Sequence, residues 1–193
     1  MSEIRVDTIA EKTTANGVSV DGVSLKDGGA ILADNLLFNA SGKGVYLGVT
    51  SATASNLLDD YEEGTFDPDL TFGGGNTGLT YSQRRGDYTK IGQAVFFTIK
   101  ISLTNKGTST GDAVISLPFS VKNTASWTGF EFVATNFCLQ NCTVAHTDGV
   151  AVCSDLAGGL IITAGQNSSV ELTDTAFNNG SNFRITGSFL TDD

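Results

Sequence analysis

The sequence predicts an all-β protein whose C-terminal part is a β-sandwich. The chain has 193 residues with 23 Gly and only 2 Pro, a composition that favours many tight turns. From residue 65 onward, short stretches of alternating apolar and polar residues follow one another at spacings of roughly 8–12 residues, which is typical of a sandwich. No stretch of useful length has the 3.6-residue period of an amphipathic helix.

Composition and charge exclude several classes of protein. The chain has 11 basic and 21 acidic residues, which give a formal net charge of −10. With no positive field to attract phosphates, the chain is not expected to bind nucleic acid or an anionic membrane surface. The sequence contains no run of about 18 apolar residues, so no membrane-spanning helix is expected. The first residues also lack the pattern of a cleaved signal peptide. The odd number of cysteines, 3, does not indicate a disulfide framework.

The aromatic residues divide the chain near residue 63. Three of them precede residue 64 and fourteen follow it. Because large buried rings dominate core energetics, the second part is expected to fold around its own core and the first part is not. We therefore predict an attachment or oligomerisation segment over residues 1–50, an acidic linker with a short helical turn over 51–64, and a head domain over 65–193.

A weak repeat occupies the N-terminal segment. Each unit joins an Asn-Gly or Asp-Gly turn to a short alternating triplet, as in Asn16–Val20 and Asp21–Leu25. Strands this short bury too little apolar area to offset an ordering cost of about 1–2 kcal/mol per residue. The apolar positions therefore need a second surface, either another copy of the chain in an intertwined oligomer or another protein on which the arm becomes ordered. These positions are Val18, Val20, Val23, Leu25 and Ile31.

The strongest β signal of the head is Ala94–Leu103, where alternate residues are apolar and share one face. That face consists of Val95, Phe97, Ile99, Ile101 and Leu103. The later strands are expected at Asp112–Leu117, Gly129–Cys138, Thr143–His146, Val150–Ser154, Gly159–Thr163, Ser169–Thr173 and Asn182–Leu190.

Two features interrupt the earlier part of the head. The predicted strand Phe66–Phe72 contains Pro68, which cannot donate a ladder hydrogen bond, so we expect this strand at a sheet edge or a bulge. Arg84-Arg85-Gly86 separates the strands Leu79–Gln83 and Asp87–Gly92 and is predicted to be a turn.

Cys138, Cys142, His146 and Cys153 have the residue types of a zinc site. Zinc needs four ligands on one tetrahedron, however, and an extended strand holds residues 138 and 142 about 13 Å apart. We therefore predict that the cysteines are small buried thiols. The alternative is a zinc site, which would need a turn between Cys138 and Cys142 to bring the ligands together. If a disulfide forms, Cys142–Cys153 across a hairpin is the natural pair. If the chain forms a trimer, an axial ring of three His146 side chains is a further way to hold a metal or an anion.

Residues 59–63 place four acids in five positions, in the order Asp59-Asp60-Tyr61-Glu62-Glu63. They lack the spacing of a calcium-binding loop, so we interpret them as a solvated acidic junction, with calcium or magnesium at a subunit interface as the alternative. The sequence contains no nucleophile elbow and no phosphate-binding glycine motif. We expect no enzymatic activity and assign no catalytic residue, metal ligand or cofactor.

Trp127 is the only tryptophan, and it lies among polar residues that favour an exposed loop. Tryptophan is enriched at binding hot spots and presents a large flat ring, although it also fills cores. We therefore take Trp127, with the amides Asn123, Gln140 and Asn141, as candidate receptor-binding residues.

Six short motifs follow one another along the chain. They are Ile4–Ile9, Asn16–Gly28, Leu57–Phe66, Gly86–Gly92, Leu117-Pro118-Phe119 and Ile185–Thr191. In this order they resemble the fibre and spike proteins of tailed bacteriophages, above all those of phages that infect marine hosts, such as cyanophages. The resemblance covers residues 1–120 and 182–193, while residues 123–180 match only in strand rhythm. It departs at Phe66, where the family usually has Trp, and in the shortness of the N-terminal shaft.

The resemblance implies a homotrimeric virion protein, assembled in the host cytoplasm. Its thin N-terminal shaft would attach to other virion proteins, and its jelly-roll-like head would bind a glycan or protein on the host surface. The competing interpretation is a capsid or tail decoration protein that braces the particle without touching the host. A third is a non-viral sugar-binding module. A receptor-binding protein is expected to expose a cluster of aromatic and amide side chains, whereas a decoration protein is expected to have an acidic head without such a cluster.

Overall fold

The computed structural model describes residues 35–122, 134–143, 151–154, 159–164 and 170–192. Two units divide the chain, Met1–Asn39 and Ala40–Asp193. In the described part, antiparallel strands dominate, and the only helices are the 3-10 turns η1 (Ala54–Asn56) and η2 (Asp174–Ala176). Neither of these described helices is long and apolar enough to cross a membrane. The prediction of an all-β protein is confirmed.

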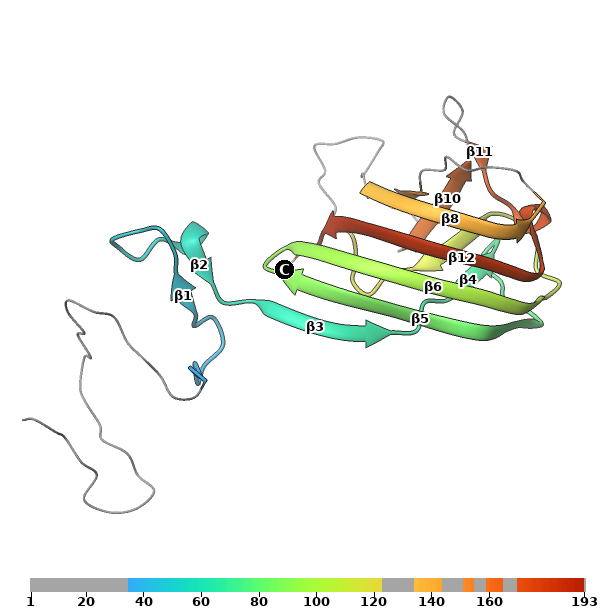
Figure 1. Cartoon of the computed structure of the whole chain (residues 1–193). Coiled ribbons are helices and arrows are strands. Elements are labelled where there is room, and N and C mark those ends of the chain that lie inside the picture. Colours follow the sequence, from blue (N-terminus) through green and yellow to red (C-terminus); the bar gives the residue numbers. More distant parts are fainter. Residues whose placement is uncertain (1–34, 123–133, 144–150, 155–158, 165–169, 193) are drawn as a thin grey trace, which may run out of the picture. The chain divides into compact units, whose positions relative to one another are not determined.

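One sheet contains five antiparallel strands in the order β3-β5-β6-β12-β8 (Figure 1). They are β3 (Tyr61–Phe66), β5 (Leu79–Ile91), β6 (Ala94–Lys106), β12 (Phe177–Leu190) and β8 (Ala134–Cys142). A tight turn at Gly92, which has a positive φ of 54°, joins β5 and β6 into a long hairpin. β12 pairs with β6 on one side and with β8 on the other. We call this the first sheet.

The second sheet is built around a central strand, β10. Its strands are β4 (Leu70–Phe72), β7 (Ala113–Ser116), β9 (Ala151–Ser154), β10 (Gly159–Ala164) and β11 (Val170–Glu171). One side of β10 pairs with β7, which pairs in turn with β4. β10 also pairs with β9 and, further along, with β11.

A small hairpin precedes the two sheets in the sequence. β1 (Val45–Tyr46) pairs with β2 (Leu57–Leu58) across η1. The Asn56 side chain donates to the Leu47 carbonyl at 3.2 Å, and the Leu47 N–H donates to the Asn56 carbonyl at 3.0 Å. η1 and β2 lie in the region predicted to be an acidic linker, whereas β1 lies in the predicted N-terminal segment.

The two five-stranded sheets share one hydrophobic core. The face predicted for β6 is confirmed, because Val95, Phe97, Ile99, Ile101 and Leu103 are each at most 4% exposed. The second sheet contributes Leu70, Phe72, Ala113 and Ile115 to the same core. The ring of Phe177 on β12 lies 5.2 Å from that of Phe72 on β4, measured between centroids, and so links the sheets. Two sheets that face each other across a common core form a sandwich-like arrangement.

The prediction of one strand over Phe66–Phe72 is wrong. β3 ends at Phe66 in the first sheet and β4 begins at Leu70 in the second, with the buried Pro68 between them. Proline has no N–H to continue a ladder, so the chain leaves one sheet there and joins the other. The Asp69 N–H donates to Ser116 Oγ at 2.8 Å, and its carboxylate pairs with Arg84. The crossing is thereby tied to both sheets.

The predicted turn at Arg84-Arg85-Gly86 is also wrong, because these residues lie within β5. Gly86 is paired with Phe66 on one side and with Ile99 on the other. A Cβ on Gly86 would overlap the Phe66 ring. The glycine therefore permits close packing inside a strand rather than a turn.

Other boundaries differ by a few residues. Thr143 lies outside any strand, so the predicted strand Thr143–His146 does not begin there, and residues 144–146 lie outside the described part. Tyr61–Gly64, placed in the predicted linker, belong to β3. β12 begins at Phe177 rather than at Asn182, and its pairing with β8 shifts register between these two residues.

Candidate functional site

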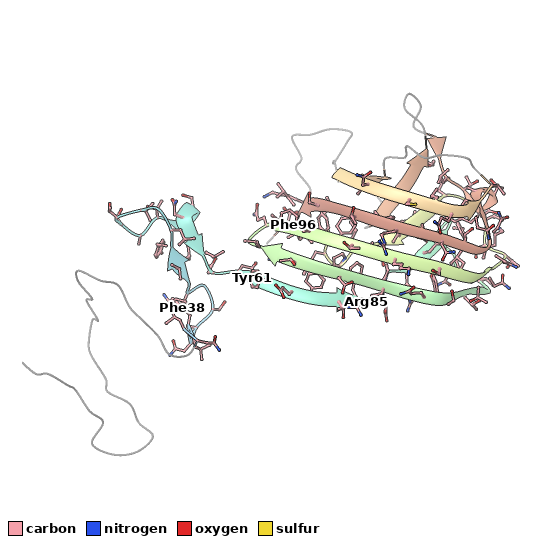
Figure 2. The ribbon with its side chains drawn as sticks, viewed as in Figure 1. Phe38, Tyr61, Arg85 and Phe96 are labelled. Carbon is pink, nitrogen blue, oxygen red and sulfur yellow. The ribbon has the colours of Figure 1, made fainter. Side chains whose placement is uncertain are left out.

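The outer face of the first sheet presents rows of polar side chains. Along each strand, alternate side chains point away from the core, and the pairing register aligns them into rows across the sheet. One row, the cationic row, consists of Arg85, Lys100, Arg184 and Cys138. The neighbouring amide row consists of Gln83, Ser102, Asn182 and Gln140. Figure 2 marks Arg85 on β5 at one end of the cationic row.

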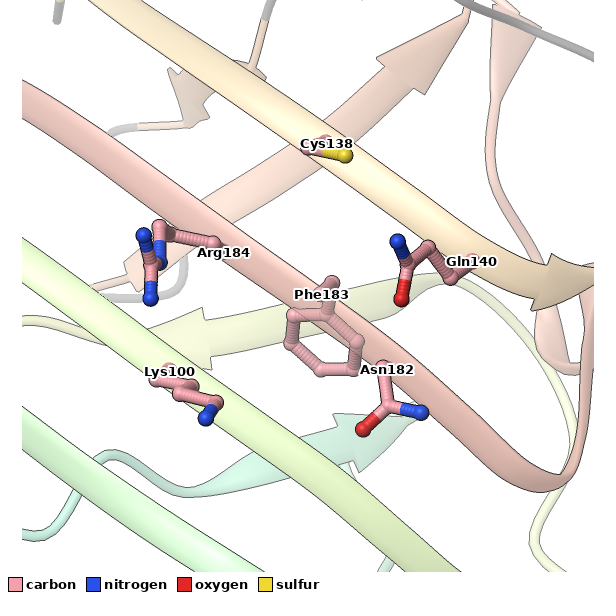
Figure 3. Close-up of a pocket in the computed structure, with 6 residues that line it drawn as sticks. All are labelled: Lys100, Cys138, Gln140, Asn182, Phe183 and Arg184. Atoms are coloured by element: carbon pink, nitrogen blue, oxygen red, sulfur yellow. The ribbon is translucent and has the colours of Figure 1, made fainter.

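A hollow of about 420 Å³ lies where these two rows cross β6, β12 and β8 (Figure 3). Its lining residues are Lys100, Cys138, Gln140, Asn182, Phe183 and Arg184. The Phe183 side chain is only 2% exposed and belongs to the core. The other five residues lie on three neighbouring strands, so the sheet itself holds them in place. The volume lies in the range of about 300–1,000 Å³ that small-molecule sites occupy.

Lys100 and Arg184 give the hollow its charge. They are direct partners across β6 and β12, where Cβ atoms are typically about 5 Å apart. Among the described residues, neither takes part in an ion pair. Arg85 differs, because its guanidinium binds Asp87 at 2.6 Å. That hydrogen bond raises the pKa of Arg85 and lowers the pKa of the Asp87 carboxyl.

Two amides and a thiol complete the hollow. Asn182 pairs with Gln140 across β12 and β8, and its Nδ2 donates to the Gly180 carbonyl at 3.1 Å. That bond leaves the Asn182 carbonyl oxygen as an acceptor. The Cys138 thiol is free and exposed. No acidic side chain lines the hollow, so it offers two cationic donors beside neutral donors and acceptors.

Of the four candidate receptor-binding residues, Gln140 lies in this hollow. Asn141 has a positive φ of 55°, and its side-chain Nδ2 donates to the Asn179 carbonyl at 3.2 Å. It shapes the end of β8 against the β12 bulge. Trp127 and Asn123 lie outside the described residues, and so do the N-terminal positions Val18, Val20, Val23, Leu25 and Ile31.

Sequence reasoning missed Lys100, Asn182 and Arg184. Each lies within a predicted strand, at a position whose side chain points away from the apolar face. That alternation was the only signal available. It does not show which outward positions on different strands lie side by side, because this depends on the pairing register.

The positions of Cys138 and Cys142 do not favour a shared metal site. The prediction of a buried thiol is wrong for Cys138, which is exposed because its side chain lies on the outer face, whereas Cys142 follows the positive φ of Asn141 and packs against the core. Both are free thiols in this structure. Burial raises the pKa of the Cys142 thiol, and a hydrogen bond with Ser181 at 3.6 Å partly offsets this. His146 and the Cys153 side chain lie outside the described residues, among which no group of three His, Cys, Asp or Glu could hold a metal ion.

The acidic junction is engaged with β5. The Asp60 carboxylate pairs with Lys90, which is only 5% exposed and whose Nζ lies 5.9 Å from the Phe119 ring centroid. The Tyr88 hydroxyl donates to Glu62, and this hydrogen bond raises the pKa of the phenol. Part of the junction therefore binds the strand beside it, while Asp59, Glu62 and Glu63 are exposed, as predicted for a solvated junction.

A second feature of the outer face is an apolar row at the other end of the sheet. The exposed fractions are 60% for Tyr61, 44% for Ile91 and 54% for Leu190. The strand pairing places them in one row, because Tyr61 pairs with Ile91, and Ala94 pairs with both Ile91 and Leu190. Phe96, the next outward residue on β6, is 52% exposed. Figure 2 marks Tyr61 and Phe96. We call these five residues the apolar row. Contiguous exposed apolar side chains are typical of interaction surfaces.

No protein family description, curated protein or solved structure matches the chain. The function therefore has to be inferred from the hollow, the apolar row and the motifs themselves.

Proposed function

We propose that this protein is a structural protein of a bacteriophage virion, a homotrimeric fibre or spike with a jelly-roll-like head. Its N-terminal segment attaches to other proteins of the particle, and its head binds a glycan or protein on the host surface. The observation that carries the binding role is the hollow on the first sheet, where cationic side chains and amides gather. The activity is binding rather than catalysis.

The contacts between the motifs support the proposal. β3 and β5 carry two of the motifs that resemble phage fibre proteins, and their register pairs Phe66 with Gly86. Phe119, from the Leu-Pro-Phe motif, packs edge-on against Tyr88 with 5.1 Å between ring centroids. Three of the six motif stretches therefore pack together in the head.

Exposed apolar side chains support the trimer. Besides the apolar row, the described residues before the first sheet expose several large side chains: Leu36, Leu37, Phe38, Val45, Tyr46, Leu47 and Leu58. A single chain leaves all of these in water, whereas neighbouring copies of the chain would cover them.

Sedimentation equilibrium of the full chain tests the assembly. We expect a mass three times the 20.1 kDa of one chain. The double variant Ile91→Ser and Leu190→Ser should weaken the trimer, because it removes apolar area from the apolar row. The matched control is Thr98→Ser with Thr186→Ser, on the same face between the two rows. A monomer at micromolar concentration contradicts the trimer.

Cell binding tests the receptor role. Fluorescent full-length protein is mixed with a panel of marine cyanobacterial strains, and bound fluorescence is measured by flow cytometry. We expect saturable binding to a subset of strains that unlabelled protein competes away. A trimer that binds no strain favours the decoration protein instead.

A further inference from the structure

We propose that the hollow over β6, β12 and β8 binds an anionic saccharide. Lys100 and Arg184 hold its carboxylate or phosphate group, and Gln140 and Asn182 hold neighbouring hydroxyls. This inference rests on the proposed function and names the ligand of the same site.

The first argument is charge. The chain carries a net charge of −10, yet Lys100 and Arg184 occupy directly paired positions on β6 and β12, and neither has a described ion-pair partner. Like charges opposite one another on a sheet destabilise it, so a fold built for stability alone would separate or neutralise them. Local conflicts of this kind are expected where a ligand binds. An anionic group placed between the two side chains would relieve the conflict and accept charge-assisted hydrogen bonds.

The second argument is the polar surroundings. Asn182 and Gln140 lie in the row next to the two cations, and an amide both donates and accepts hydrogen bonds. This suits sugar hydroxyls, which also do both. A simple inorganic anion would use the cations and leave the amides without a role.

The third argument is the position on the sheet. The backbone of β12 is already paired with β6 and β8, so an extended peptide cannot add to it as a further strand. Over β12, recognition therefore has to come from side chains around a hollow of about 420 Å³. A compact ring with a charged substituent fits that demand better than an acidic protein segment.

Titration calorimetry with the full-length protein tests the proposal. The probes are hexagalacturonate, a phosphorylated mannose oligosaccharide, neutral maltohexaose and a hexa-aspartate peptide. We expect one or both anionic saccharides to bind about tenfold or more tightly than maltohexaose, with affinity falling as salt rises. Which of the two binds identifies the carboxylate or the phosphate.

The variant pair Lys100→Gln with Arg184→Gln should lose about tenfold or more of this affinity, because two charged donors are removed. The control, Lys43→Gln with Lys122→Gln, makes the same change of charge outside the hollow and should bind as the native protein does. Circular dichroism confirms that both variants fold. Equal binding of maltohexaose or of the peptide, no binding of either anionic saccharide at millimolar concentration, or an unaffected hollow variant overturns the proposal.

Cell binding separates the failure of this inference from the failure of the proposed function. If the native protein binds host cells and the hollow variant binds them equally well, the receptor role stands and the hollow is not its site. If the native protein binds hexagalacturonate through Lys100 and Arg184 but binds no cell, the saccharide site stands and the receptor role fails.

Discussion

The ring of Phe66 lies over Gly86, its direct partner across β3 and β5, and occupies the space that a side chain on Gly86 would need. The reverse arrangement occurs at the neighbouring inward-facing pair, where the ring of Tyr88 covers Gly64. An aromatic ring over a glycine on the adjacent strand supplies the contacts that the glycine lacks. These two pairs join the start of the first sheet to its long hairpin.

Gly86→Ala should lower the free energy of unfolding by about 1–3 kcal/mol, because the new methyl group displaces the Phe66 ring. Urea denaturation of the full chain measures this. In a Phe66→Ala background the same change should cost much less, since the obstructing ring is gone. Equal costs in the two backgrounds would show that the ring is not the cause.

Asp174 should make stability depend on pH. Its carboxylate accepts the Gly111 N–H at 3.0 Å and pairs with Lys106 Nζ at 3.1 Å. Both contacts lower the pKa of the Asp174 carboxyl, and the hydrogen bond from the Gly111 backbone has a larger effect than the one from Lys106. A carboxyl whose pKa is lower in the folded chain stabilises the fold above its unfolded pKa, and this stabilisation is lost as pH falls through the folded pKa.

We therefore expect Asp174→Asn to lower the Tm at pH 7 and to narrow the difference in Tm between pH 7 and pH 3. Thermal unfolding followed by circular dichroism measures both. Asp59→Asn, at an exposed position, serves as the control and should change little. An Asp174→Asn variant with native Tm at both pH values would contradict the role of this carboxylate.

Lys100→Thr should stabilise the fold by about 0.2–1 kcal/mol, because it removes a positive charge from between two arginines and places a good strand former on β6. The gain in the urea midpoint should shrink as salt screens the repulsion. Lys43→Thr is the matched control outside the first sheet. A loss of stability would mean that Lys100 supports the fold rather than a ligand.

Cys138 should react with iodoacetamide faster than Cys142 at pH 8. Cys138 is exposed, whereas Cys142 is half-buried and burial raises its thiol pKa, so less thiolate is present and access is poorer. Peptide mass spectrometry after timed labelling measures both rates. A saccharide bound in the hollow should slow labelling of Cys138 and leave Cys142 unchanged. Equal protection of both thiols would indicate a general tightening of the protein instead.

Some features of this protein follow from local pattern. The alternation in Ala94–Leu103 predicted the buried face of β6, because side-chain direction in a strand has a period of two whatever the neighbouring strands are. The same regularity, repeated along the head, was enough to predict an all-β chain with a shared core.

Other features depend on which strands pair and in what register. Gly86 has the local signature of a turn, yet it lies inside β5, where the lack of a side chain leaves room for the Phe66 ring on β3. The hollow arises in the same way. Lys100 and Arg184 are far apart in the sequence and meet only because β12 pairs with β6. Register is set by the packing of the whole sheet, so tertiary structure decides what the outward side chains form together.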